Sequence, residues 1–270
     1  MDIIDAHVHL YPDAIAARVT ETLGGRFGNS PAFVASVAGC RERAAAAGIG
    51  LALNLPVATE TGQVENANRW AQGLNRESAT PGVATVRSLA ALHPAGEDLV
   101  GQVERIAAMG FKGIKLHPEY QNFRFGDSGM DAVWETMAGL GLVAYLHAGG
   151  ERVFKGPYRS SPWEVARLKR RFPALTVVAA HLGGFGMWDE AEARLCGTKV
   201  FMDLSHTFGW MHKTQILRMI VKHGAERVLF GTDAPWQDPV KVVEAFMRLP
   251  LSAAERQAIL HDNAAGLFGF

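Results

Sequence analysis

Five side chains that can bind a metal ion stand at or just beyond the ends of short apolar segments in this 270-residue chain. They are His7, His9, His147, His181 and Asp233. Imidazole nitrogens and carboxylate oxygens without thiolates suit zinc, and also manganese, iron or cobalt. Three or four such ligands leave a position open, and the ion lowers the pKa of a bound water to about 7. The pattern predicts a catalytic divalent metal site, with zinc as the expected ion and one ion favoured over two.

His7 and His9 form the most local part of this pattern, the sequence His-Val-His. Side chains alternate along an extended strand, so the two imidazoles should point to the same side and could grip one ion. On its own this spacing is equally compatible with two buried histidines bonded to backbone. His147, His181 and Asp233 taken singly are also compatible with core or capping roles. The five together favour the metal site.

Eight apolar segments alternate with longer amphipathic stretches, which is the pattern of repeated βα units. Strands are predicted at Asp2–His7, Ile49–Leu55, Val83–Leu89, Gly113–His117, Val143–His147, Thr176–His181, Lys199–Leu204 and Arg227–Gly231. Helices are predicted at Glu60–Glu77, Glu97–Met109 and Asp238–Leu249, and after the capping serines Ser161 and Ser252, with Gly110 as a C-cap. Because there is no linker, the fold class expected is α/β, a (β/α)8 TIM barrel in a single domain, with a doubly wound open sheet as the competing arrangement.

Several longer motifs bear these residues. They read DAHVHLYP, GFKGIKLHPEYQ, LHAGG, FPALTVVAAHLGG, FGTDAPW and LSAAERQAILHDNAAGLFG. In this order they resemble the amidohydrolase superfamily, and more closely its amidohydrolase-related (amidohydrolase 2) branch of metal-dependent TIM-barrel hydrolases. The resemblance covers essentially the whole chain and implies one amidohydrolase-type domain over residues 1–270. The motifs are specific for the branch and not for a substrate.

The resemblance implies a role for each strand-end residue. His7, His9 and His147 would bind the metal. Asp233 would bind the metal or its water, act as general base on that water and pass the proton to the leaving group. His181 would hold the nucleophilic water or the substrate oxygen, or bind a second metal.

The fourth predicted strand leaves alternatives open. Relatives with two metals carry a glutamate or a carbamylated lysine there, and this strand holds Lys115 and His117 but no carboxylate. Lys115 could be carbamylated and bridge two ions, or stay a cation while His117 contacts substrate; an ion pair inside the barrel is the structural alternative. Glu119, just beyond the strand, could pair with Lys115 or touch substrate.

Residues in the loops after the strands are candidates for substrate contacts. His206 follows the seventh predicted strand and Trp236 the eighth, and aromatic side chains there could line an apolar or aromatic pocket. Arg124, Arg152 and Arg159 follow strands four and five, where a guanidinium could bind a substrate carboxylate. His93 is expected to be structural.

Three functions fit these residues. The first is hydrolysis, in which metal-activated water attacks an amide, lactone or ester carbonyl of a small molecule. The second is non-oxidative decarboxylation of an aromatic or unsaturated acid, known within the same branch, for which carboxylate-orienting arginines would matter most. The third, a barrel that binds a ligand without catalysis, has no support in the sequence, because every expected ligand is present.

Composition limits the partners. Lysine and arginine together number 27, and aspartate and glutamate together also number 27. The chain therefore has no basic excess that would predict nucleic-acid binding. No apolar run is long enough to span a bilayer, and the N-terminus has no basic region or cleavage site of a signal peptide. The two cysteines, Cys40 and Cys196, have no metal-site or disulfide spacing. A cytoplasmic location is expected, and the chain could form a homo-oligomer.

Overall fold

The structure is a computed structural model that describes residues 3–28 and 30–270. The chain divides into two compact units, one made of the N-terminal residues to Asn54, Leu74–Arg87 and Asp203–Phe270, the other of Leu55–Gly73 and Ser88–Met202. Asp2, the first residue of the first predicted strand, lies outside the described residues.

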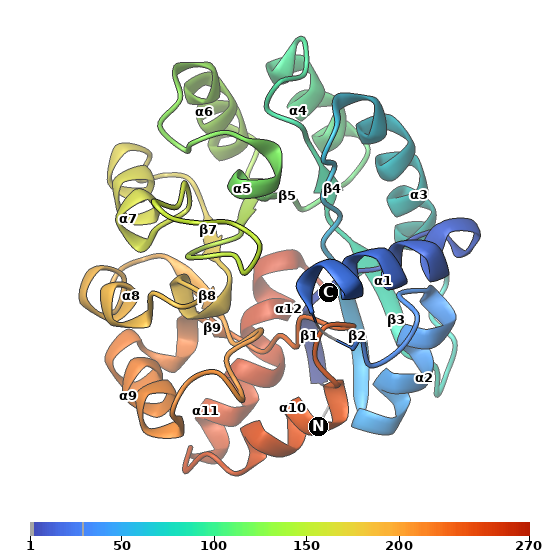
Figure 1. Cartoon of the computed structure of the whole chain (residues 1–270), viewed down its shortest axis with the longest axis vertical. Helices are drawn as coiled ribbons and strands as arrows, with labels where there is room; N and C mark the ends of the chain where they lie inside the picture. The colour runs from blue at the N-terminus through green and yellow to red at the C-terminus, as the bar shows by residue number, and fades with distance from the viewer. Residues whose placement is uncertain (1–2, 29) are drawn as a thin grey trace. The chain divides into compact units, whose positions relative to one another are not determined.

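The first unit contains strands from both ends of the sequence and helices that follow them (Figure 1). Its elements are β1 (Ile3–Val8), α1 (Asp13–Phe27), α2 (Val37–Ala47), β2 (Ile49–Asn54), most of β3 (Thr85–Ser88), α9 (Lys213–His223), β9 (Val228–Leu229), α10 (Pro239–Met247), α11 (Ala253–Gln257), a π-helical turn (Ala258–Asp262) and α12 (Asn263–Phe268). β1 pairs in parallel with β2, and Ala6 on β1 donates a backbone hydrogen bond to Phe230 just after β9.

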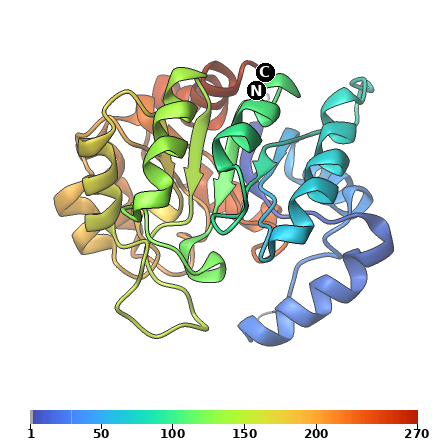
Figure 2. The same cartoon turned by 90° about the horizontal axis from the view of Figure 1, so that it is seen from above.

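The second unit contains the middle of the sequence, and its strands run parallel. Its elements are most of α3 (Val64–Arg76), β4 (Ala90–Ala91), α4 (Leu99–Ala108), β5 (Gly113–Leu116), α5 (Pro118–Gln121), α6 (Asp131–Gly139), β6 (Val143–Leu146), α7 (Pro162–Arg171), β7 (Val177–Ala179), α8 (Trp188–Arg194) and the first two residues of β8 (Phe201–Asp203). Figure 2 shows helices of this unit running alongside its strands. Every residue of β5, β6 and β7 is buried, as expected for parallel strands covered on both faces.

The predicted strands and helices are present, most of them with shorter bounds, while the first strand runs to Val8, one residue beyond its predicted end. The third predicted strand, Val83–Leu89, corresponds to β3, and a further short strand, β4, follows beyond its predicted end. The sixth ends at Ala179, and a 3₁₀ turn at His181–Gly183 follows. Gly110 has φ +87° just past α4 and so ends that helix as predicted.

The last helical segment begins at a capping box that the sequence predicts. The Ser252 hydroxyl accepts a hydrogen bond from the Glu255 backbone N–H, and the Glu255 carboxylate accepts one from the Ser252 backbone N–H. We expect Ser252→Ala to lower the free energy of unfolding by about 1 kcal/mol, because the first turn loses a partner for one of its free N–H groups. Urea unfolding followed by circular dichroism measures this, and an unchanged midpoint would show that the cap contributes nothing.

None of the helices in the described part of the chain combines the length and apolar character that crossing a membrane requires.

Candidate metal centre and active site

His7, His9 and Asp233 meet in the first unit. The two Nε2 atoms lie 3.2 Å apart, as the alternation of side chains on β1 predicts. Asp233 Oδ1 lies 3.3 Å from His7 Nε2 and 3.2 Å from His9 Nε2, so three potential ligand atoms form a nearly equilateral triangle. His7 is almost fully buried and His9 is slightly more exposed.

This triangle fits a divalent metal ion. Ligand atoms bonded to one ion at 2.0–2.2 Å are separated from one another by roughly 3.0–3.6 Å. All three separations here fall within that range. The donors are two imidazole nitrogens and one carboxylate oxygen, a set that zinc and manganese both accept. His7, His9 and Asp233 can therefore hold such an ion on one side.

The second oxygen of Asp233 is bound by a third imidazole. His206 Nδ1 lies 2.7 Å from Asp233 Oδ2. Burial by itself would raise the pKa of the Asp233 carboxyl, but hydrogen bonds from His206 and His9 and the charge of His7 hold that pKa well below its ordinary value. Asp233 is thus an anion at neutral pH with a proton-carrying ring beside it.

Backbone strain accompanies these positions. Asp233 has φ +66° and His206 has φ +53°, and His181 in the second unit has φ +59°. Residues other than glycine rarely adopt this left-handed backbone conformation, and those that do are concentrated at functional sites. The three residues lie in the turns that follow β7, β8 and β9.

The turn that contains Asp233 is fastened to β1. Asp233 donates its backbone N–H to the His7 carbonyl at 2.9 Å, and His9 donates to the Ala234 carbonyl at 2.7 Å. The Thr232 backbone N–H and hydroxyl both donate to the carboxylate of Asp5. Burial raises the pKa of Asp5 to about 7, against these hydrogen bonds. Local backbone pairing thus holds the three ligand atoms together.

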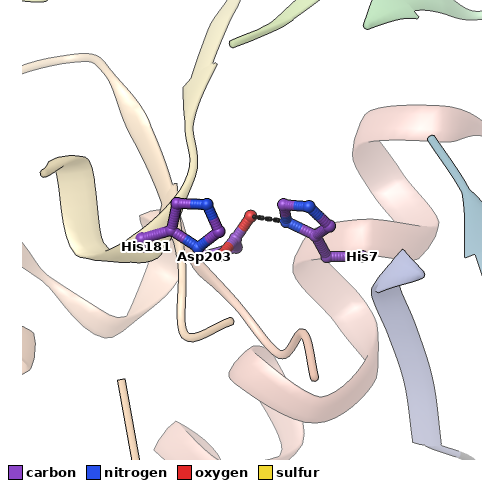
Figure 3. A group of neighbouring side chains, drawn as sticks. All are labelled: His7, His181 and Asp203. Carbon is purple, nitrogen blue, oxygen red and sulfur yellow. Dashed lines mark hydrogen bonds and ion pairs between the residues drawn. The ribbon is translucent and has the colours of Figure 1, made fainter. Parts of the chain in front are cut away.

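The other ring nitrogen of His7 is hydrogen-bonded to Asp203, a residue that was not among the candidates predicted from the sequence. His7 Nδ1 lies 2.8 Å from Asp203 Oδ2 (Figure 3). Asp203 ends β8 and is fully buried. The available signal was a carboxylate ending an otherwise apolar strand, the same signal that selected Asp233.

Aromatic residues surround Asp233 and His206. Trp236 is buried and donates its backbone N–H to the Asp233 carbonyl. The Trp210 ring lies 5.4 Å from the His206 ring, and Trp210 is 46% exposed. Burial and the charge of Asp233 raise the pKa of Tyr11 to about 12, so its phenol stays neutral and can donate a hydrogen bond. The first unit thus places aromatic residues next to Asp233 and His206.

The second unit gathers the remaining strand-end histidines. His147 Nε2 lies 2.9 Å from the Gly150 carbonyl, which can only accept, so this nitrogen is assigned the proton. The other nitrogen, Nδ1, lies 3.2 Å from His181 Nε2. His117 stacks on His147 with ring centroids 3.9 Å apart, and Glu151 approaches His117 Nε2 at 3.6 Å. His147 Nδ1 and His181 Nε2 therefore lie side by side, and imidazole nitrogens of this kind can bind a metal ion.

Glycines explain how the loops after β6 and β7 bring these rings together. A Cβ on Gly149 would lie 2.2 Å from the Phe185 backbone nitrogen, so only glycine fits there. The close approach allows Gly150 to donate to the Phe185 carbonyl and Phe185 to donate to the Ala148 carbonyl. The motif LHAGG thus fastens one histidine-bearing loop to the next.

The other candidates of the second unit have different surroundings. Lys115 is buried with its Nζ 5.2 Å from the Tyr145 ring centroid, a contact that suits an ammonium ion. Arg159 is bound by Glu119 and by Asn122, and its backbone N–H also donates to Glu119. Glu119 is therefore the partner of an arginine from the loop after β6.

Arg124 and His93 are also accounted for by contacts within the second unit. The Arg124 guanidinium lies 3.7 Å from Glu164 on α7. His93 Nε2 lies 3.2 Å from the Thr59 carbonyl, and its Nδ1 accepts a hydrogen bond from the Ala95 backbone, which agrees with the structural role expected for it. Glu151, which faces His117, was not selected from the sequence because nothing in a loop marks such a contact.

Comparisons with known proteins agree with the fold. The family described as Amidohydrolase matches residues 4–270. The gamma-resorcylate decarboxylase of Polaromonas sp. (strain JS666 / ATCC BAA-500) is 24% identical over 266 aligned residues, covering 81% of this chain and 82% of the relative.

Solved structures are similar over nearly their whole length. The uncharacterized TIM-barrel protein Bb4693 from Bordetella bronchiseptica has a TM-score of 0.79 and 21% identity, covering 99% of this chain and 98% of that one. A dihydroxybenzoic acid decarboxylase from Polaromonas sp. JS666, with bound manganese and the inhibitor 2-nitroresorcinol, has a TM-score of 0.73 and 19% identity, covering 99% and 97%. These similarities establish the (β/α)8 barrel fold, and with the family match they show that the chain is an enzyme that belongs to the amidohydrolase family.

Proposed function

We propose that this enzyme is a metal-dependent, non-oxidative decarboxylase of an aromatic hydroxycarboxylic acid. The observation that carries the proposal is the position of Asp233, whose one oxygen faces the His7 and His9 nitrogens and whose other oxygen faces His206. A carboxylate between a cation site and an imidazole can receive and deliver a proton. The activity named for the Polaromonas relative supports this reading over hydrolysis, which was the first reading of the sequence.

The proposed reaction is ArCO₂⁻ + H⁺ → ArH + CO₂. The bond between the ring carbon and the carboxyl carbon breaks, its electron pair stays on the ring carbon, and a proton joins that carbon. A bound divalent ion would supply positive charge that orients the oxygens of the substrate and disperses their charge. His7, His9 and Asp233 would hold this ion.

Asp233 is proposed to move the proton. Because it rests as an anion, it must first be protonated, and a protonated His206 can pass its Nδ1 proton across the 2.7 Å to Oδ2. The acid then delivers that proton to the ring carbon. In hydrolysis the same pair would run in the opposite sense, with Asp233 as the base that the sequence analysis expected.

The surroundings of Asp233 support an aromatic substrate. The Trp210 ring lies beside the His206 ring, and Trp236 follows Asp233 in the same turn and donates its backbone N–H to the Asp233 carbonyl. Aromatic rings stack or meet edge to face with favourable energies of about 0.5–1.5 kcal/mol beyond area burial. A benzoate with hydroxyl groups could stack there, with polar atoms toward the imidazoles.

Four residues of the second unit also have roles in the proposed reaction. His147 is proposed as a further metal ligand, and His181, His117 and Lys115 as substrate contacts, since each belongs to the carboxyl end of a barrel strand, where barrel enzymes do their chemistry. Arg159 is left out of the proposed substrate contacts, because Glu119 and Asn122 bind its side chain.

A paired substrate panel tests the proposal. Protein loaded separately with manganese and with zinc is supplied with gamma-resorcylate and other hydroxybenzoates, and in parallel with aryl esters, lactones and amides of matched size. Carbon dioxide release and chromatographic separation of products measure the two reactions. We expect carbon dioxide from at least one hydroxybenzoate. Turnover of only the esters, lactones or amides would replace the proposal by hydrolysis.

A further inference from the structure

Two polar side chains contact His7 on the side of its ring away from His9 and Asp233. Asp203 Oδ2 is 2.8 Å from His7 Nδ1, and Ser205 Oγ is 2.9 Å from the same nitrogen. Asp203 and Ser205 are both fully buried. Figure 3 shows the Asp203 carboxylate directed at the His7 ring. Buried polar groups in such number around one nitrogen restrict where its proton can be.

The hydrogen-bond directions in this group follow from its fixed donors. The Ser205 backbone N–H donates to Asp203 Oδ1 at 2.8 Å, and the Ser205 hydroxyl also donates to Oδ1. With its proton given to Asp203, the hydroxyl has only lone pairs left for His7. A carboxylate oxygen and a hydroxyl lone pair thus both face His7 Nδ1, and both require that this nitrogen carry the hydrogen.

Gly231 packs closely against His7 and Ser205. A Cβ on Gly231 would lie 3.0 Å from the His7 Cβ and 3.4 Å from the Ser205 Cβ, so the glycine leaves just the space that this group occupies. Gly231, two residues after β9, therefore packs against the Cβ atoms of His7 and Ser205, and a larger residue there would crowd both.

We propose that Asp203, assisted by Ser205, is a positioning residue that fixes His7 in the tautomer with hydrogen on Nδ1 and a lone pair on Nε2. This inference rests on the metal site of the proposed function and goes beyond it by assigning these two residues. The Nε2 lone pair then faces the point shared with His9 and Asp233. Hydrogen-bond partners behind a ligand commonly set its orientation and raise its basicity.

Asp203→Asn gives a sharper test than a simple deletion. The Ser205 backbone N–H cannot change from donor to acceptor, so the amide oxygen must take the Oδ1 position. The amide NH₂ then falls opposite His7 Nδ1 and donates to it. His7 must place its own hydrogen on Nε2, which removes the lone pair that a metal needs. Ser205→Ala keeps the carboxylate and its acceptor and should leave the tautomer unchanged.

The test has two readouts. The ¹⁵N spectrum of the metal-free imidazoles at about pH 8, where an ordinary imidazole is neutral, reports the tautomer, with His7 assigned from the spectrum of His7→Asn. Equilibrium dialysis against Mn²⁺ reports affinity. We expect Nδ1–H in the native protein and Nε2–H in Asp203→Asn, with Mn²⁺ binding about 10- to 100-fold weaker. Ser205→Ala should lose only a few-fold, and Glu244→Gln, an exposed carboxylate on α10, should match the native protein.

Each outcome decides the matter. Nε2–H in the native protein, which needs no variant, would overturn the inference, as would native Mn²⁺ affinity in a folded Asp203→Asn. A native protein with Nδ1–H that takes up no Mn²⁺ would instead remove the metal from the proposed function and leave the positioning of His7 in place.

Discussion

Asp233→Asn is expected to lower kcat for decarboxylation by about 10²- to 10⁴-fold, the usual contribution of a positioned acid or base. Asparagine keeps the shape of the side chain but cannot carry the proton between His206 and the ring carbon. It also replaces an anion that three imidazoles surround, since His7, His9 and His206 all approach the carboxylate. Initial rates with the best substrate of the panel measure the effect.

The control for this prediction is an exposed carboxylate of the same unit. Glu244→Gln on α10 removes one exposed charge that pairs with Arg248 four residues later. We expect native rates for it, and native circular dichroism for both variants. Turnover within two-fold of native in a folded Asp233→Asn would show that another group handles the proton.

Removal of the metal is the second large effect expected. Dialysis against a chelator should abolish turnover, and stoichiometric Mn²⁺ or Zn²⁺ should restore it, because the ion would disperse negative charge that develops on the substrate. The chain should not unfold when the ion leaves, since backbone hydrogen bonds from Asp233 to His7 and from His9 to Ala234 hold the ligands without it. Elemental analysis beside the rate measurement follows both quantities.

A ligand variant separates metal loss from general damage. His9→Ala should reduce metal content well below one ion per chain, and it disturbs packing less than a change at the more buried His7. His212→Ala, an exposed histidine before α9, is the matched control and should keep its metal. Equal metal content in both variants would exclude His9 from the site, and full activity without any metal would contradict the proposed chemistry.

The parts of the site that follow from local rules could be predicted from sequence. Alternation along β1 places His7 and His9 on one side, and their Nε2 atoms do meet. Parallel strands bring their carboxyl ends to one edge, which is why Asp233 after β9 joins them. The capping serines Ser161 and Ser252 also act as expected, because a cap is decided within four residues.

Contacts between segments far apart in sequence could not be predicted. Asp203 bonds to His7 across 196 positions, and only the observed pairing of the segments around β1, β8 and β9 brings the two together. Arg159 was a candidate for a substrate carboxylate, but a buried carboxylate at Glu119 binds it instead. The sequence does not show which carboxylate lies next to a given arginine, so it cannot distinguish a paired guanidinium from one that is available to a substrate.

The end of β3 at Ser88 has a similar origin. The sequence predicts one strand that ends at Leu89, whereas β3 ends at Ser88 and a second short strand, β4, begins at Ala90. The Ser88 hydroxyl donates to the Leu89 carbonyl, which offers the backbone a partner outside the sheet. Whether a serine in a strand makes such a bond depends on surroundings that periodicity does not contain.

The most direct test of the central claim follows the proton in deuterated water. The manganese-loaded enzyme is incubated with gamma-resorcylate, or with the best hydroxybenzoate of the panel, and both products are measured by mass spectrometry. Decarboxylation by the Asp233–His206 pair predicts equal amounts of carbon dioxide and arene, with one deuterium on the carbon that had carried the carboxyl group. No carbon dioxide from any hydroxybenzoate, with the metal shown to be bound, would contradict it.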